Sequence, residues 1–137
     1  MFIDPSRELV IFAKLAQAFK SRLMMQDRDR ALIMAGVCAS MMQMKEIASF
    51  CHQLILQNNR GHMLKRYENF EEALTTEDFV SFLKQVRRKL PTERAEVQIE
   101  ELGYICDVRR KDYDDPDVYI AALLGVDFDW VKENFSE

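Results

Sequence analysis

The sequence contains little glycine, proline or cysteine, and no stretch in which apolar and polar residues alternate for long enough to indicate a β-sheet. The 137 residues include four glycines, three prolines and three cysteines. Three of the glycines lie where a helix is expected to end. These absences argue against a β-rich fold and favour an all-α protein.

An odd number of cysteines argues against a secreted protein held together by disulfide bonds. Cys38, Cys51 and Cys106 are expected to lie in apolar, helical surroundings and not in loops. The chain begins with residues such as Asp4 and Glu8, where a signal peptide would carry a basic region and then an apolar run. We therefore expect a soluble protein in a reducing cytoplasm.

The sequence also lacks a hydrophobic run long enough to cross a membrane. Its uncharged stretch, 31–44, has fourteen residues, whereas a membrane-spanning helix needs about 20 apolar residues. The stretch instead predicts a helix buried in the middle of a helical protein. Within it Gly36 and Ser40 lie four residues apart, as do Ala35 and Ala39, so a neighbouring helix can approach closely there.

No motif of a known catalytic or metal-binding chemistry is present. Gly-x-Ser-x-Gly, Cys-x-x-Cys and His-Glu-x-x-His are all absent. Cys51 and His52 are neighbours on one expected helix, so they point about 100° apart and do not readily bind one ion. We predict no metal and no cofactor, and we disfavour an enzyme. A metal-dependent enzyme that uses His52 or His62 with carboxylates ranks last among the hypotheses.

The charges are divided unevenly along the chain, although the net charge is only -4. Residues 1–111 carry 18 Lys and Arg against 15 Asp and Glu, whereas residues 112–137 carry 1 against 8. This acidic segment would repel nucleic acids, but it can lie against a basic patch on the chain itself or on a partner. Its simplest interpretation is a solvated end that keeps the protein soluble.

The spacing of the apolar residues predicts about seven helices joined by short connections. The expected ranges are 5–25, 31–44, 45–58, 75–90, 92–103, 116–124 and a short last helix that begins at 127. One or two further turns are expected within 61–74, because Asn69 and Glu72 have the spacing of a capping box. We therefore predict a single all-α domain over residues 1–137, built as a bundle or as stacked helical hairpins.

Several of the expected helix ends carry recognisable signals. Asp4 precedes a proline, which is typical of a helix start. Asp27 or Asp29 is expected to cap the uncharged helix, and Thr75 the helix that contains residues 79–90. Gly103 is expected to end the helix that begins at residue 92.

Basic residues form the most interesting polar grouping. A helix that begins near Asn59 would carry cations in its first turns, and exposed first-turn amides together with cations suit a phosphate or another anion. A second group of cations follows on one face of the helix 79–90. The residues of this predicted anion site are Arg60, His62, Lys65, Arg66, Arg87 and Arg88. The alternative is a set of solvated cations paired with nearby carboxylates.

Methionines gather in and after the uncharged stretch. Their flexible thioethers fill irregular gaps in a core, and they also adapt to varied partners at a binding surface. The predicted partner surface consists of Met34, Met41, Met42 and Met44. Ordinary core packing is the alternative.

Two functions from different classes follow from these features. The first is a non-enzymatic interaction, adaptor or regulatory module that binds a protein partner. The second is an anion- or nucleotide-binding protein that uses the basic surface around 60–66 and 84–88. Sequence-specific DNA binding is disfavoured, because the helix after Pro91 carries Glu93, Glu96 and Glu100 where recognition helices carry basic or amide side chains. A symmetric homodimer remains open.

Overall fold

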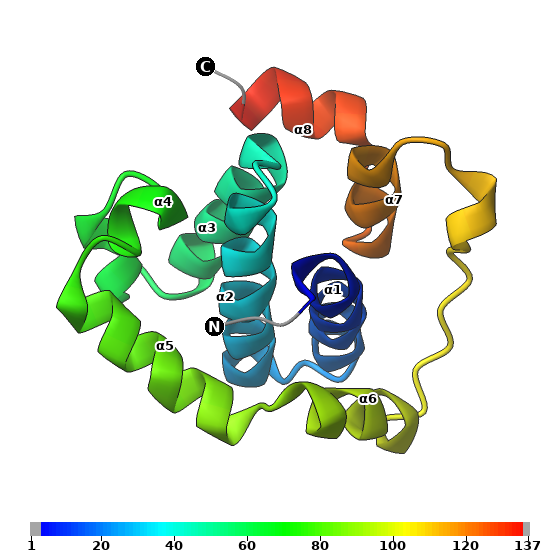
Figure 1. Ribbon diagram of the computed structural model, residues 1–137. Helices are drawn as coiled ribbons and strands as arrows, with labels where there is room; N and C mark the ends of the chain where they lie inside the picture. The colour runs from blue at the N-terminus through cyan, green and yellow to red at the C-terminus, as the bar shows by residue number, and fades with distance from the viewer. Residues whose placement is uncertain (1–3, 136–137) are drawn as a thin grey trace.

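Three consecutive helices, α1 (Pro5–Ser21), α2 (Met25–Met41) and α3 (Lys45–Asn58), form the centre of the molecule, with α2 between the other two (Figure 1). The computed structural model describes residues 4–135. Every residue of α2 from 31 to 39 is buried. This confirms that the uncharged stretch is a central, buried helix, although the helix ends at Met41 and residues 42–44 form the turn into α3.

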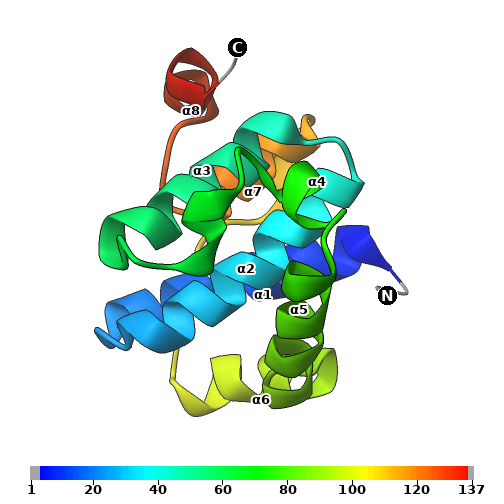
Figure 2. The ribbon, with the colours of Figure 1, turned by 90° about the vertical axis from the view of Figure 1, so that its left-hand side faces the viewer.

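The remaining helices surround this centre. They are α4 (Phe70–Ala73), α5 (Glu77–Lys89), α6 (Thr92–Glu101), α7 (Pro116–Leu123) and α8 (Phe128–Phe135), with short 3₁₀ turns at Met63–Arg66 and Arg110–Asp112. Figure 1 places α6 below the central helices and α8 above them, and Figure 2 shows the same order from the side. Within residues 4–135 the structure thus has eight α-helices and no strand, which confirms the all-α fold class.

The acidic segment 112–137 packs on the rest of the protein over the part that the structure describes. Helix α7 buries Tyr119, Ile120 and Leu123 and contacts α1 and α3. Helix α8 lies against α3, where the rings of Trp130 and Phe135 meet the ring of Phe50 edge-on at 5.8 and 5.6 Å. The apolar sides of both helices therefore hold the segment in place, and Asp115 and Asp127 accept hydrogen bonds at the starts of α7 and α8.

None of the helices among residues 4–135 combines the length and the apolar character that crossing a membrane requires. The longest, α1 and α2, have 17 residues each, and both carry charged side chains. Their apolar faces pack against neighbouring helices of the same domain.

Most of the predicted helix ends agree with the structure. The Asp4 carboxylate accepts a hydrogen bond from the Arg7 backbone N–H at 3.2 Å and so caps α1. Asn69 accepts from the Glu72 N–H at 2.8 Å, as a capping residue does, but the Glu72 carboxylate accepts from Glu68 and not from Asn69. Gly103 ends α6 with a φ of +66°, a left-handed conformation that glycine adopts without strain.

The expected start of α2 was wrong, and so was the expected cap of α5. Helix α2 begins at Met25, and neither Asp27 nor Asp29 caps it. The turn after α1 is only three residues long, so the helix starts before either aspartate, and Asp29 is buried inside the fold. Helix α5 is capped by Thr76, whose hydroxyl accepts from the Phe79 N–H, and not by Thr75.

The turn between α1 and α2 places Leu23 in a left-handed conformation, with a φ of +58°. Residues other than glycine are strained in this conformation by about 1–2 kcal/mol. Leu23 is also 83% exposed, so its side chain contributes little packing. We expect Leu23→Gly to raise the free energy of unfolding by about 1 kcal/mol in urea titrations. Leu23→Ala keeps the strain and should give no such gain; an equal gain from both variants would contradict this explanation.

Gly36 allows one close contact between α2 and α4. A Cβ atom at this position would lie only 2.3 Å from a ring carbon of Phe70, and Phe70 is buried. The close approach that the small residues of the uncharged stretch predict is therefore made by an aromatic side chain of a short helix. This contact fixes α4 over the middle of α2.

Candidate functional site

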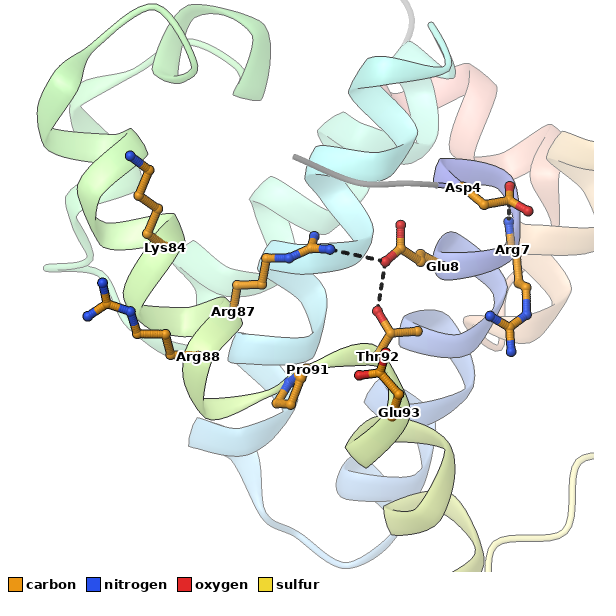
Figure 3. A pocket seen from close by; sticks show the side chains of 9 residues that line it. All are labelled: Asp4, Arg7, Glu8, Lys84, Arg87, Arg88, Pro91, Thr92 and Glu93. Carbon is orange, nitrogen blue, oxygen red and sulfur yellow. Dashed lines mark hydrogen bonds and ion pairs between the residues drawn. The ribbon is translucent and has the colours of Figure 1, made fainter.

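A cleft of about 550 Å³ lies where the first turn of α1 meets α5 and the turn into α6 (Figure 3). Its volume is in the range of small-molecule sites. Charged side chains of both signs predominate in it. The lining residues are Asp4, Arg7, Glu8, Lys84, Arg87, Arg88, Pro91, Thr92 and Glu93.

Two prolines help to position these side chains. Pro5 lies at the first position of α1, so the charged first turn of that helix begins immediately after the Asp4 cap. Pro91 cannot continue α5, and α6 starts anew at Thr92. The two helix starts thereby face each other across the cleft, and Arg7 of α1 bonds Glu96 of α6 at 2.6 Å.

Glu8 is the central residue of the cleft, and only 4% of it is exposed. Its Oε1 atom accepts a hydrogen bond from the Thr92 hydroxyl at 2.7 Å and lies 3.4 Å from an Arg87 nitrogen. Its Oε2 atom is buried as well, and no hydrogen-bond partner for it occurs in the described part of the chain. A buried acceptor without a partner typically costs about 1–3 kcal/mol, so half of this carboxylate is poised to accept a donor.

Three of the four cations of the cleft come from one face of α5, and the fourth, Arg7, comes from α1. Figure 3 shows Arg87 reaching across to Glu8, whereas Lys84 and Arg88 extend outward from the same helix. Both of these outer side chains are exposed, and neither forms an ion pair with a residue in the range 4–135. The rim of the cleft therefore carries positive charge that is available to an anion.

Cys38 of α2 lies close enough to this group for the charge of Glu8 to act on it. Burial raises the pKa of the Cys38 thiol strongly, and the negative charge of Glu8 raises it further, against a smaller opposite effect of Arg87. The thiol therefore stays protonated at neutral pH. Since the thiolate is the nucleophile, this cysteine is unsuited to covalent catalysis.

The structure separates the residues of the predicted anion site. Arg87 and Arg88 line the cleft, whereas the other four lie beyond the end of α3, and His62 faces a different cavity on the opposite side of α5. Arg66 lies 3.7 Å from Asp78 in an exposed ion pair. The side chains outside the cleft are Arg60, His62, Lys65 and Arg66. These six residues therefore do not line one cleft.

His62 has a structural position at the start of a 3₁₀ turn. Its Nδ1 atom accepts a hydrogen bond from the Leu64 N–H at 3.1 Å, and its ring packs edge-on against Phe82 at 5.6 Å. Burial lowers the pKa of His62 below its ordinary value of 6.5, with a smaller opposite effect of Asp29 and a minor lowering by His52. The native structure therefore favours the neutral form of the His62 ring.

This lowered pKa predicts a pH dependence of stability. Below about pH 6.5 the unfolded chain binds a proton at His62 while the native protein still resists it. The free energy of unfolding should therefore fall as the pH drops through 6.5, and the effect should level off below the native pKa. His62→Asn keeps an acceptor for Leu64 but does not titrate, so urea titrations from pH 7.5 to 5 should show a shallower decline. Parallel curves for the two proteins would exclude His62 as the cause.

The methionines of the predicted partner surface are divided between core and surface. Met34 and Met44 are buried, because they face the neighbouring helices of the central group, so neither can contact a partner. Met41 and Met42 are 45% and 37% exposed. Met41 lines a groove of about 720 Å³ between the turn into α3 and the short helix α4. The groove is lined by Ser40, Met41, Gln43, Lys45, Glu46, Ala48, Ser49, Asn69, Phe70, Glu71, Leu74 and Phe135.

The structure gives no geometric support to a metal centre in residues 4–135, where no three His, Cys, Asp or Glu side chains lie together as ion ligands would. His52 is buried, and its Nε2 donates a hydrogen bond to the Leu64 carbonyl oxygen at 2.9 Å. This bond and an edge-on contact with Phe70 give His52 a role in holding the loop after α3.

Glu8 and Thr92 were missed by the sequence interpretation. Glu8 resembles an ordinary acidic residue in the first turn of a helix, where it complements the helix dipole. One signal was available: Glu8 falls on the same stripe as Phe12, Leu15 and Phe19, all of which are buried. A carboxylate on an apolar stripe needs a partner, and that requirement points to a site.

Comparison of the chain with protein-family models, with curated proteins and with solved structures gives no significant match. The functional argument therefore rests on the cleft itself and on its chemistry.

Proposed function

We propose that this protein is a non-enzymatic binding protein whose cleft between α1 and α5 takes a small anionic ligand, such as a phosphate or carboxylate compound. The observation that carries the proposal is the positive rim of the cleft, where Lys84 and Arg88 have no ion-pair partner among residues 4–135. Arginine and lysine are the side chains that proteins use most to bind such anions.

The arrangement of the cleft supports a binding role more than a catalytic one. Arg87 and Thr92 are held by Glu8, so the inner part of the cleft is preorganised by contacts between three different helices. The neighbouring thiol of Cys38 is protonated and buried. Binding without chemistry accounts for these features.

Inorganic phosphate is the first probe for this function. Thermal unfolding of the protein should shift to higher temperature as phosphate is added, because a ligand that binds only the native state stabilises it. At 100 times the dissociation constant the gain is about 2.7 kcal/mol. Added NaCl should reduce the shift, since the contacts at the exposed rim are screened.

Adjacent residues of α5 provide a matched control. Arg88→Gln removes one positive charge from the cleft, and Lys89→Gln removes one from the next residue, which lines the cavity on the other side of the helix. The phosphate shift should shrink in Arg88→Gln and persist in Lys89→Gln. Equal shifts in both variants would mean that phosphate binds elsewhere or through net charge alone, and no shift in the wild type would exclude the proposed function.

We also propose, as a second function, that the groove at Met41 binds one amphipathic segment of a partner protein. Its lining includes the apolar side chains of Ala48, Phe70 and Leu74 and the charged side chains of Lys45 and Glu71. A lining with apolar and charged side chains suits an amphipathic helix, which presents both kinds of side chain. This second proposal retains the interaction module that the methionines predict from the sequence.

A displayed peptide library tests the groove by offering it many amphipathic sequences at once. Peptides selected on the wild type should lose binding to Met41→Asp, which places a charge at an exposed position and should leave the fold intact. Lys89 lies outside the groove, so the same peptides should still bind Lys89→Gln. Selected peptides that bind Met41→Asp as well as the wild type would remove the groove from consideration.

The cysteines lead us to propose a reducing compartment such as the cytoplasm as the site of action. Cys38 and Cys51 are buried free thiols, and Cys106 is half-buried. Burial raises the pKa of the Cys51 thiol to about 12, so it stays protonated and unreactive. The protein can be isolated from its cell, unfolded and alkylated rapidly. Mass spectrometry should then find that all three cysteines were reduced.

A further inference from the structure

We infer that the ligand of the cleft carries an ammonium group beside its anionic group, and that Glu8 binds this ammonium. The inference rests on the proposed anion-binding function and specifies the chemical class of its ligand. It starts from the second carboxylate oxygen of Glu8, which has no hydrogen-bond partner among residues 4–135.

The carboxylate of Glu8 has hydrogen-bonding capacity at both oxygens. Oε1 accepts from the Thr92 hydroxyl at 2.7 Å and faces Arg87 at 3.4 Å. Oε2 is buried without a partner in the described chain, and Figure 3 shows it pointing away from Thr92. Glu8 lines the cleft, so a rotation of its side chain would turn this oxygen toward a donor on a ligand there.

An ammonium group is the donor that fits best. Glu8 is 4% exposed, and a charged donor forms a stronger bond to a carboxylate than a neutral one, especially where water is excluded. Arg87 alone is a poor partner for the whole carboxylate, because its nearest nitrogen is 3.4 Å from Oε1. A ligand ammonium would therefore complete the charge compensation of Glu8.

The charges around the cleft favour a ligand with both signs. Four cations line it, and so do three carboxylates. A simple anion would be attracted by Lys84 and Arg88 but repelled by Glu8, and a simple amine would experience the reverse. A small zwitterion places each charge near its opposite. Phosphorylated amines and amino acids share this chemistry.

Three probes separate the contributions. O-phosphoethanolamine carries both charges, ethyl phosphate has a similar size without the ammonium, and ethanolamine has the ammonium without the anion. Isothermal titration with wild-type protein should give at least tenfold tighter binding for phosphoethanolamine than for either of the others. Equal binding of phosphoethanolamine and ethyl phosphate would overturn the inference but leave the anion-binding function standing. If neither phosphate compound binds, the proposed function fails first.

Glu8→Gln tests the named residue. It keeps the shape of the side chain and removes its charge, so the preference for phosphoethanolamine over ethyl phosphate should fall to about one while ethyl phosphate still binds. A preference that stays tenfold in a folded Glu8→Gln protein would overturn the role of Glu8. If this variant does not fold, the role of Glu8 is tested with the amide NMR spectrum of the wild-type protein. Phosphoethanolamine should move the resonances of Glu8 and Thr92 more than ethyl phosphate does, and identical changes would contradict the assignment.

Amino acids provide the second source of the same chemistry. Glycine and β-alanine present a carboxylate and an ammonium at two different separations, whereas acetate lacks the ammonium. Tighter binding of either amino acid than of phosphoethanolamine would identify a carboxylate as the anionic group. Tighter binding of phosphoethanolamine would identify a phosphate. Both results support the zwitterion, whereas weaker binding of all three zwitterions than of acetate and ethyl phosphate would refute it.

Discussion

Replacing Asp29 by alanine is expected to lower the free energy of unfolding by about 3–5 kcal/mol. Asp29 and Arg28 form a buried ion pair, with 3.1 Å between an Arg28 nitrogen and Oδ1 of Asp29. Arg28 also donates to the Leu54 carbonyl oxygen, and the Asn58 amide donates to Asp29 at 2.7 Å. Without the carboxylate, a buried guanidinium remains uncompensated and the Asn58 amide loses its acceptor.

The exposed pair of Arg66 and Asp78 is the control for this prediction. Its charged atoms are 3.7 Å apart and both side chains are largely in water, so Asp78→Ala should change stability by no more than about 1 kcal/mol. Urea unfolding at pH 7 measures the free energy of unfolding of both variants. We expect this free energy to depend on the urea concentration with the same slope in each variant. Similar losses in the two variants would show that the burial of Asp29 does not determine its contribution.

A double variant distinguishes the loss of a partner from the value of the pair itself. Arg28→Met combined with Asp29→Leu removes both charges and fills the space with apolar side chains. Such exchanges are often neutral or stabilising, because the pair no longer has to be desolvated. We expect the double variant to recover most of the stability that Asp29→Ala loses. A loss as large as in Asp29→Ala would mean that the contacts of Arg28 with α3 matter more than its charge.

Local signals predicted most of the fold. The range 45–58 for α3 agrees with the structure at both ends, because apolar spacing defines one face and Asn58 and Asn59 mark its end. Asp4, Asn69 and Gly103 act as their positions predict, since a cap depends on residues only a few positions away. Each of these interactions involves residues within one short segment of the sequence.

Contacts between distant segments account for what the sequence did not predict. Asp29 has the appearance of a helix cap, but its partners include Asn58, 29 residues away. Met34 and Met41 belong to the same helix, yet one is buried and the other is 45% exposed, because only the arrangement of neighbouring helices decides which side is covered. A methionine suits both environments, so its identity carries no information about the choice.

The candidate site illustrates the same limit. Arg87 and Arg88 were among the predicted anion-binding residues because they share a face of one helix. Their actual partner, Glu8, lies 79 residues from Arg87 in the sequence, and Thr92 lies 84 residues from Glu8. No spacing rule connects positions so far apart. The cleft exists because α1 packs beside α6, and that contact follows from the whole domain.

Gly36→Ala is expected to destabilise the protein by about 1–3 kcal/mol, although alanine is the better helix former by about 1 kcal/mol. The added Cβ would lie 2.3 Å from one ring carbon of Phe70 and 2.5 Å from another, far inside ordinary contact distance. Phe70 is 1% exposed and is packed edge-on against His52 and Phe79, so the ring has little room to move. Overpacking therefore outweighs the gain in helix propensity.

Two further variants test this explanation of Gly36. Gly61 has only one neighbouring atom, at 3.8 Å from the position of an added Cβ, so Gly61→Ala should not produce an overpacking loss. Phe70→Leu removes the ring that causes the clash, so Gly36→Ala should be much less harmful in that background than in the wild type. Urea titrations of the four proteins in this cycle give the coupling energy between the two positions. A coupling energy near zero would mean that the backbone of α2, and not the ring of Phe70, requires glycine at this position.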